Sequence, residues 1–213
     1  MKGDKFMVHN TLTESKIVQV LDWSCDKAIN GLPGMKTADE LATKYLIKYN
    51  SVDEAIDNFI KWQQAKCATS GFLTSLGGII TLPVAIPANI SSVIYIQIRM
   101  IATIAKMRGY DLRDDQVKSL VYISFTGQAA ADILKQVGIK IGAKMSTALI
   151  KKLPIEIIKQ IKKYVGFRIA TKFGEIGIIN LGKYIPIVGG VIGGTVDAVG
   201  THTIGKTAKK FFD

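Results

Sequence analysis

Few side chains of this 213-residue chain are of the types that carry out chemistry. His9 and His202 are its two histidines, and His9 lies in a polar N-terminal segment. On a helix, His202 would share one face with Asp197 and Lys206, which predicts a structural polar cluster. Neither histidine has a nucleophile or a set of metal ligands near it in sequence, and GxSxG, HExxH and zinc-ligand spacings are absent. The sequence therefore predicts a protein that is not an enzyme and that needs no cofactor or metal.

The two cysteines also carry no chemical motif. Cys25 and Cys67 show neither a CxxC nor a Cys/His spacing, which favours buried free thiols in a reducing compartment over a disulfide or a metal site. The N-terminal residues MKGDKFMVHNTLTESK mix charges and contain no apolar run of the kind found in secretory signals. These features predict a cytoplasmic protein.

The formal net charge of +11 is distributed unevenly along the chain. Residues 1–66 carry a net charge of 0, residues 67–134 and 173–213 carry +1 each, and residues 135–172 carry +9. A solvated protein surface does not require such a bias. The basic block 135–172 therefore predicts an anionic partner, such as phospholipid headgroups, an acidic surface of a membrane protein, or nucleic acid.

Within the basic block, apolar residues recur at helical spacing from Ile158 to Phe173. This pattern predicts an amphipathic basic helix, with a kink at Gly166, of the type that lies at a membrane surface. The candidate contact residues are the basic side chains Lys151, Lys152, Lys159, Lys162, Lys163, Arg168 and Lys172. Two alternatives stay open: a solvated bundle helix, and a nucleic-acid interface in which Tyr164 and Phe167 stack on bases.

Residues 67–98 form a segment without a single charged side chain. Pro83 and Pro87 divide it into two arms, and Arg99 follows directly. A bilayer span needs roughly 20 consecutive apolar residues, which neither arm reaches. A single straight transmembrane helix is thus disfavoured. A hairpin buried in the protein core is favoured, and a hairpin that dips into one leaflet stays open.

Helix signals place these segments in an all-α fold. Three capping boxes predict three helices within residues 1–66: Thr11-Leu-Thr-Glu14, Thr37-Ala-Asp-Glu40 and Ser51-Val-Asp-Glu54. Further helices are predicted over residues 88–108 and 116–137 and from residue 195 onward. The expected architecture is one compact domain built around the proline-broken hairpin, in which residues 1–66 pack on a helical core formed by residues 67–213.

Two details of the later helices can be tested by a structure. Asp132 shares a helix face with apolar residues, which predicts partial burial and an internal pair with Lys135 or Arg99. The glycine-rich run 189–194 lacks the GxxxxGK[ST] pattern of a phosphate loop and follows no strand. Close approach between helices is the favoured interpretation of these glycines.

Two blocks of the sequence resemble the EcsC family. The first contains Gly77-Gly-Ile-Ile-Thr-Leu-Pro-Val-Ala-Ile-Pro87 and the later Arg108-Gly-Tyr-Asp111; the second runs from Asn180 through the glycine run to Asp197 and Ala208. The resemblance covers roughly residues 60–210. Its signature positions are Pro83, Pro87, Arg99, Asp111, Asp132 and Asp197. It implies a bacterial, helical protein of a family named after a partner of an ABC transporter operon, and it brings no catalytic residue or cofactor.

These observations predict a non-enzymatic accessory or binding protein that associates with the inner face of the membrane. Its basic face in residues 135–172 would meet anionic lipid or a membrane protein. A toxin-like protein that inserts the 67–98 hairpin to form a pore is the first alternative. A helical nucleic-acid-binding protein is the second and less favoured alternative.

Overall fold

The computed structural model describes residues 13–68, 86, 88–139, 153–180 and 189–213, and over these residues the fold is all-α, as predicted. The described helices are α1 (Glu14–Asn30), α2 (Ala38–Lys48), α3 (Val52–Ala68), α5 (Ala88–Met107), α6 (Asp115–Phe125), the 3-10 turn η1 (Gly127–Ala129), α7 (Ala130–Gln136), α9 (Ile155–Asn180) and α10 (Gly189–Phe211). No strand occurs among them.

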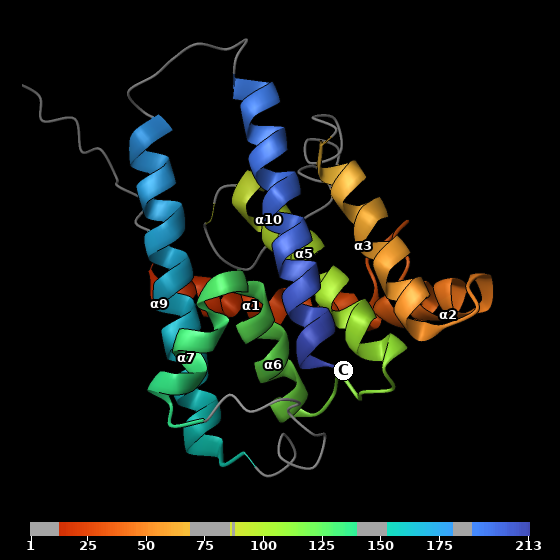
Figure 1. The fold of residues 1–213 in the computed structure, drawn as a ribbon. Helices are drawn as coiled ribbons and strands as arrows, with labels where there is room; N and C mark the ends of the chain where they lie inside the picture. The colour runs from red at the N-terminus through yellow and green to blue at the C-terminus, as the bar shows by residue number, and fades with distance from the viewer. Residues whose placement is uncertain (1–12, 69–85, 87, 140–152, 181–188) are drawn as a thin grey trace, which may run out of the picture.

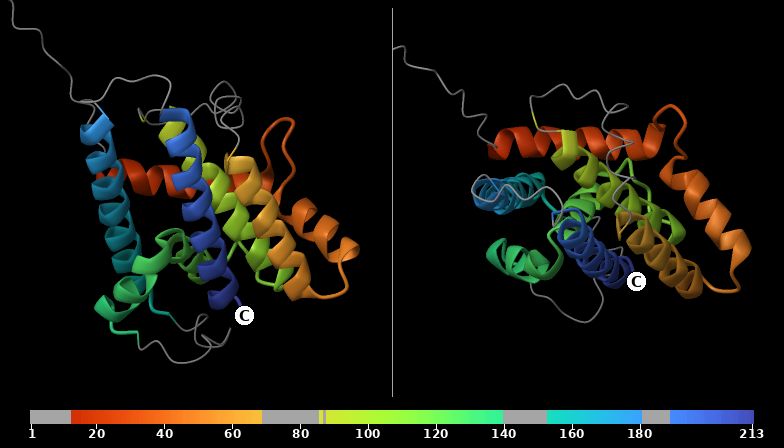
Figure 2. Two further views of the ribbon diagram at one scale, coloured as in Figure 1. Left: turned by 45° about the horizontal axis from the view of Figure 1, so that its top comes forward. Right: turned by 90° about the horizontal axis from the view of Figure 1, so that it is seen from above.

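Helix α5 lies at the centre of the arrangement and packs against α1, α2, α3, α6 and α10. Helix α1 crosses behind α5 and α9 at a steep angle, whereas α9, α10 and α3 run roughly upright in the view of Figure 1. Seen from above, α9 lies at one end of the molecule and α2 at the other (Figure 2). The two ends are thus separated by the width of the core.

The N-terminal helices begin at residues whose side chains cap the backbone N–H groups of the first turn. Glu40 N–H donates to Thr37 Oγ1 at 3.1 Å and Thr37 N–H donates to the Glu40 carboxylate at 2.7 Å, which confirms that capping box. Ser51 accepts from Glu54 N–H at 3.1 Å, as predicted. The cap of α1 was predicted two residues too early: Thr13, which accepts from Lys16 N–H at 3.3 Å, takes the place expected for Thr11.

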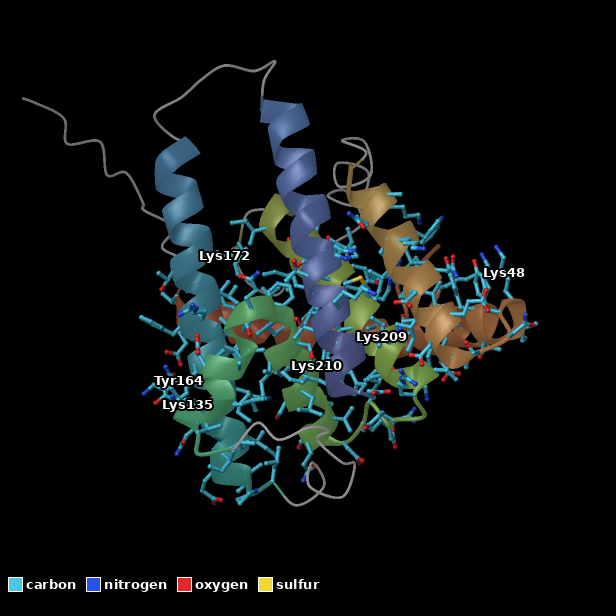
Figure 3. The ribbon with its side chains drawn as sticks, viewed as in Figure 1. Lys48, Lys135, Tyr164, Lys172, Lys209 and Lys210 are labelled. Carbon is cyan, nitrogen blue, oxygen red and sulfur yellow. The ribbon has the colours of Figure 1, made fainter. Side chains whose placement is uncertain are left out.

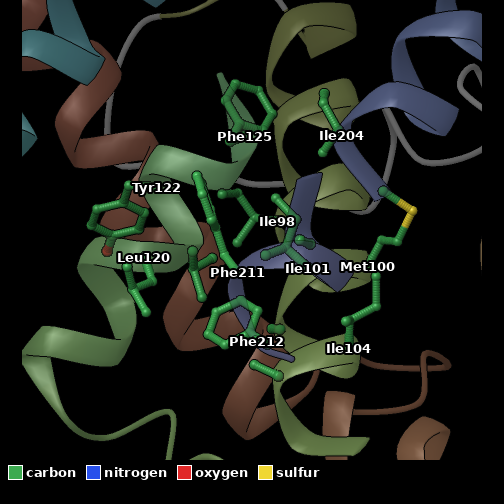
Figure 4. Packing of buried hydrophobic residues seen from close by; sticks show 14 of the residues in the cluster. Ile98, Met100, Ile101, Ile104, Leu120, Tyr122, Phe125, Ile204, Phe211 and Phe212 are labelled. Carbon is green, nitrogen blue, oxygen red and sulfur yellow. The ribbon is translucent and has the colours of Figure 1, made fainter. Parts of the chain in front are cut away.

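The core gathers around α5 because that helix is apolar on nearly every side. Ile98, Ile101 and Ala105 are fully buried. Figure 4 shows side chains of α5, α6 and α10 converging, with Ile98 and Ile101 beside Phe211 and Phe212. Of the described helices, α5 alone is long and apolar enough over Ile90–Met107 to cross a membrane, but 83% of that window is buried inside the protein. The core helix of a protein can be as long and as apolar as a membrane span. The burial of α5 inside the protein therefore accounts for its apolar composition.

The charge-free hairpin is described only in part. Its second arm begins α5 at Ala88, and Ile86 is half-buried against the core. The first arm over residues 69–85, together with the signature residues Pro83 and Pro87, lies outside the described residues. Burial of the whole hairpin therefore stays a prediction.

The prediction of one continuous helix over residues 116–137 is wrong. It breaks after Phe125, where Thr126 Oγ1 donates to Ile123 O at 2.6 Å and Gly127 takes a φ of +59°. Such a positive φ suits glycine because other residues meet a steric penalty there. The break rotates α7 relative to α6, so Asp132 is exposed and the predicted partial burial is wrong.

Helix α10 begins earlier than predicted. It starts at Gly189 instead of Thr195, so the glycine run forms its first turns. The side chains of residues 189–199 lie outside the described part. Close helix approach is seen at a later glycine: a Cβ added to Gly205 would lie 2.8 Å from Ile60 Cγ1 of α3.

Candidate functional site

Helix α9 turns its apolar side toward α1, α6 and α7. Ile158, Ile161, Val165 and Ile169 are each at most 3% exposed, which confirms the predicted amphipathic pattern up to that residue. The side chain of Phe173, the last member of the pattern, lies outside the described residues. Burial of these four side chains fixes which face of α9 points outward.

Gly166 brings α9 close to α1. A Cβ at this position would lie 2.9 Å from both Glu14 Cγ and Val18 Cγ2, and 3.1 Å from Glu14 O. Helix α9 runs without interruption through Gly166, and the kink predicted there stays a prediction. Glycine serves the contact between the two helices, since no larger side chain fits the space.

The outward face of α9 is basic and aromatic. Lys159, Lys163, Arg168 and Lys172 are exposed, and none of them forms an ion pair with a side chain that the structure describes. Tyr164 is 39% and Phe167 is 62% exposed on the same side. Figure 3 places Tyr164 at the outer edge of α9, near Lys135 of α7 in that view. This face, defined by Lys159, Lys163, Tyr164, Phe167, Arg168 and Lys172, is called the α9 outer face below.

One of the predicted contact residues, Lys162, does not join this face in the structure. Lys162 Nζ lies 3.0 Å from Asp22 Oδ1, which also accepts a hydrogen bond of 2.6 Å from the Tyr122 hydroxyl. Burial raises the pKa of Tyr122, so the phenol stays protonated and donates to Asp22. Lys162 is therefore half-buried and ties α9 to α1. Lys151 and Lys152 lie outside the described residues.

A cavity of about 410 Å³ opens beside this contact between α1, α6 and α9. Its charged lining residues are Asp22, Asp26, Asp115, Arg113, Lys118 and Lys162. Much of this charge is compensated within the wall, since Lys118 pairs with Asp115 at 3.0 Å and Lys162 with Asp22. The cavity also borders Cys25, a free and buried thiol as predicted, whose pKa burial raises to about 12. Such a thiol is unreactive at neutral pH.

The signature residue Arg99 has a structural role. It is 4% exposed. Its Nη1 donates to Lys36 O at 3.1 Å, and its guanidinium lies 5.6 Å from the centre of the Tyr95 ring. Arg99 thus joins α5 to the segment before α2, and the predicted pair with Asp132 does not form.

The other acidic signature residues do not assemble into a site. Asp111 is exposed and accepts from Arg113 N–H at 3.0 Å within a turn, and Asp132 is exposed on α7. Asp197 belongs to α10, but its side chain lies outside the described residues. Over the part of the chain that the structure describes, no three His, Cys, Asp or Glu side chains gather as a metal site would require.

Sequence reasoning missed one group of charges, which joins α3, α5 and α10. Lys206 lies 2.9 Å from Asp57. Its predicted cluster with Asp197 and His202 stays a prediction, since the Asp197 side chain lies outside the described residues. Lys209 lies 2.8 Å from Asp57 and 3.2 Å from Asp53, and Arg108 lies 2.6 Å from Asp53. The five residues Asp53, Asp57, Arg108, Lys206 and Lys209 are called the α3–α10 ion-pair cluster. The spacing of Asp53 and Asp57 on one helix face was the available signal, but Arg108 lies 55 residues from Asp53 and the two lysines lie about 150 residues from Asp57.

The described helices define an all-α domain with a buried central helix and one outer helix whose exposed face is basic and aromatic. The sequence pattern of the EcsC protein family matches residues 4–213, so the chain belongs to the EcsC family. The match extends the resemblance seen over residues 60–210 to the N-terminal helices. No curated protein and no solved structure matches the chain.

Proposed function

We propose that this EcsC-family protein is a non-enzymatic accessory protein that binds the anionic inner face of the membrane through the α9 outer face. The observation that carries the proposal is the set of four exposed cations on this face, Lys159, Lys163, Arg168 and Lys172, that have no carboxylate partner among the described residues. Unpaired cations on one side of a helix are attracted to a negatively charged lipid surface.

The size of this attraction supports a reversible interaction. A Lys or Arg near an anionic leaflet contributes about 1 kcal/mol, so four of them contribute roughly 4 kcal/mol. On its own this corresponds to a dissociation constant of about 1 mM. Because exposed charges are screened within about 10 Å at 0.1 M salt, binding should weaken steeply as salt is added. Lys162 does not add to this attraction, because Asp22 already neutralises its charge.

The test is co-sedimentation with vesicles of phosphatidylcholine and phosphatidylglycerol in a 70:30 ratio, at low and high salt. We expect the triple variant Lys159→Glu, Lys163→Glu, Arg168→Glu to lose binding. The matched control is Lys44→Glu, Lys48→Glu, Lys61→Glu, which makes the same change of charge at exposed positions of α2 and α3. Lys48 lies at the opposite end of the molecule from α9 (Figure 3).

The control separates a specific face from net charge alone. Equal loss of binding in both triple variants would mean that only the total charge matters, and the proposed role of α9 would fall. Binding by the unchanged protein to vesicles of phosphatidylcholine alone would remove the electrostatic basis of the proposal.

The same vesicles, loaded with a dye, address the pore-forming alternative that was predicted for residues 67–98. Release of dye at neutral or acidic pH would replace passive binding with insertion of that segment. A salt-sensitive gel shift with single-stranded nucleic acid, without vesicle binding, would favour the nucleic-acid alternative, since exposed aromatics beside cations also stack on bases.

A further inference from the structure

The aromatic residues of α9 occupy a definite position between its cations. At 3.6 residues per turn, Gln160, Tyr164, Phe167 and Thr171 fall within about 60° of the helix circumference. Lys159 and Lys163 lie on one side of this strip, and Arg168 and Lys172 lie on the other. All eight side chains are exposed. The outer face is therefore an aromatic strip with two cations along each border.

Phe167 lies at the edge of this strip that borders Lys163, and Tyr164 lies at the opposite edge. Phe167 is 62% exposed, more than any other aromatic side chain among the described residues, and Tyr164 is 39% exposed. Thr171 adds little polarity to the strip, because its hydroxyl already donates to Phe167 O at 3.0 Å within the helix. Single exposed apolar residues are common, but two exposed aromatic side chains between cations are typical of an interaction surface, although Gln160 and Thr171 lie between them on the helix.

The geometry points to one occupant of this strip. We infer that Phe167 and Tyr164 insert between the headgroups of an anionic bilayer, so that α9 lies parallel to the membrane plane with its cations at the level of the phosphates. A helix that lies in the interface buries its aromatic side chains only a few ångströms deep, while long cationic side chains reach outward to the phosphates. The inference rests on the proposed function and specifies the orientation and the residues of that contact.

The symmetry of the charges supports a lipid surface over a partner protein. Phosphates surround an inserted side chain on all sides, so a bilayer satisfies the cations on both borders of the strip at once. The borders hold four cations, and the single acidic residue of the first turn, Glu156, lies at the end of the helix. Tyr164 carries a hydroxyl that suits the polar boundary of the bilayer, where tyrosine and tryptophan are enriched.

A fluorescent probe at residue 167 tests the insertion directly. In a Cys67→Ala background, Phe167→Cys is labelled with an environment-sensitive dye, and Cys25 remains in place because its buried thiol does not react. The control is Ile47→Cys on α2, which is 82% exposed and lies in the helix at the other end of the molecule. Vesicles contain phosphatidylcholine and phosphatidylglycerol at 70:30, with or without lipids that carry a quencher near the glycerol.

We expect the emission at residue 167 to shift to the blue and to be quenched upon vesicle binding, while the emission at residue 47 stays unchanged. Co-sedimentation should show that Phe167→Ser weakens binding about tenfold and that Tyr164→Ser weakens it less. Both side chains are exposed, so the variants should keep the thermal midpoint of the unchanged protein.

Each of the other outcomes shows whether the insertion of α9 or the proposed function itself is wrong. If the protein binds vesicles and the probe at residue 167 stays in water, insertion is wrong and electrostatic binding stands. If both probes enter the lipid, the α9 orientation is wrong. If the unchanged protein does not bind at low salt, the proposed function fails and the inference fails with it. Equal affinity of Phe167→Ser and the unchanged protein also overturns the inference.

Discussion

The α9 outer face and the α3–α10 ion-pair cluster use cationic side chains in opposite ways. In the cluster, Lys206, Lys209 and Arg108 each lie within 3.0 Å of a carboxylate oxygen of Asp53 or Asp57. On the outer face, no cation has a carboxylate partner among the described residues. The cluster thus holds three helices together, whereas the outer face leaves its charge available to another molecule.

The difference teaches that net charge along the sequence does not identify a binding surface. Lys162 and Lys163 are neighbours in the basic block, yet Lys162 pairs with Asp22, whereas Lys163 is exposed and has no ion-pair partner among the described side chains. Helical geometry separates them, because successive residues point about 100° apart. One lysine therefore belongs with the internal ion pairs and the other with the outer face.

The largest expected effect on stability concerns the glycines that bring each region together. Gly166 contacts α1, and Gly205 contacts Ile60 of α3. We expect Gly166→Ala and Gly205→Ala each to lower the free energy of unfolding by about 1–3 kcal/mol, because the added Cβ overpacks the contact. The loss should be larger for Gly166, where a backbone oxygen at 3.1 Å cannot move aside as the Ile60 side chain can.

Urea denaturation measures these losses, and hydrogen exchange followed by mass spectrometry locates them. Gly166→Ala should reduce protection in α9 and α1, and Gly205→Ala should reduce it in α10 and α3. A uniform loss of protection in both variants would mean that the two regions form one cooperative unit, and the comparison would lose its structural basis.

Adjacent lysines sharpen the comparison further. Lys162→Ala should lower the free energy of unfolding by about 1 kcal/mol, because it leaves Asp22 with the Tyr122 hydroxyl as its remaining partner, and should leave vesicle binding unchanged. Lys163→Ala should do the reverse: a loss of about fivefold in vesicle binding with no change in stability. The pair needs no other control, since each variant serves as the control of the other. An equal effect of both variants on vesicle binding would mean that Lys162 also belongs to the α9 outer face.

Local signals predicted the parts of this fold that depend on neighbours in sequence. The capping box of Thr37 and Glu40 and the buried side of α9 required only spacing over one or a few turns. The sequence did not predict the break after Phe125, because a glycine inside an apolar helical pattern is ordinarily tolerated. Gly127 lies beside residues far away in the chain, since a Cβ added to it would lie 3.6 Å from Thr203 Cγ2 and 3.7 Å from Ile204 Cγ1 of α10.

The sequence predicted the type of the candidate site better than it predicted which residues belong to that site. The basic block and its helical period indicated the face, and Tyr164 and Phe167 were already noted as aromatic residues on it. Membership depended on partners that spacing does not reveal, since Asp22 lies 140 residues before Lys162 and Lys36 lies 63 residues before Arg99. Which cations are neutralised is thus a property of tertiary packing.

The smallest expected effect is the response of the α3–α10 ion-pair cluster to pH. The hydrogen bond from Lys209, together with the charge of Arg108, lowers the pKa of Asp53 below its usual value. Burial raises the pKa of Asp57, but hydrogen bonds from Lys209 and Lys206 outweigh it and lower that pKa overall. Burial lowers the pKa of Lys209, and its bonds to both aspartates outweigh this and raise it.

The signs of these shifts define a window of stability. A lowered aspartate pKa stabilises the folded state above the unfolded value of about 3.9, and this contribution is lost as the pH falls through the folded-state pKa. The raised pKa of Lys209 stabilises below about pH 10.4, and this is lost as the pH rises through its folded-state value. Because the carboxylates are partly exposed, each pair contributes only about 0.5 kcal/mol. Asp53→Asn with Asp57→Asn should flatten the unfolding free energy at the acidic edge of this window, as measured by urea denaturation between pH 3 and pH 6. The same double variant should bind anionic vesicles as the unchanged protein does, and a loss of binding would show that the cluster and the outer face are not independent.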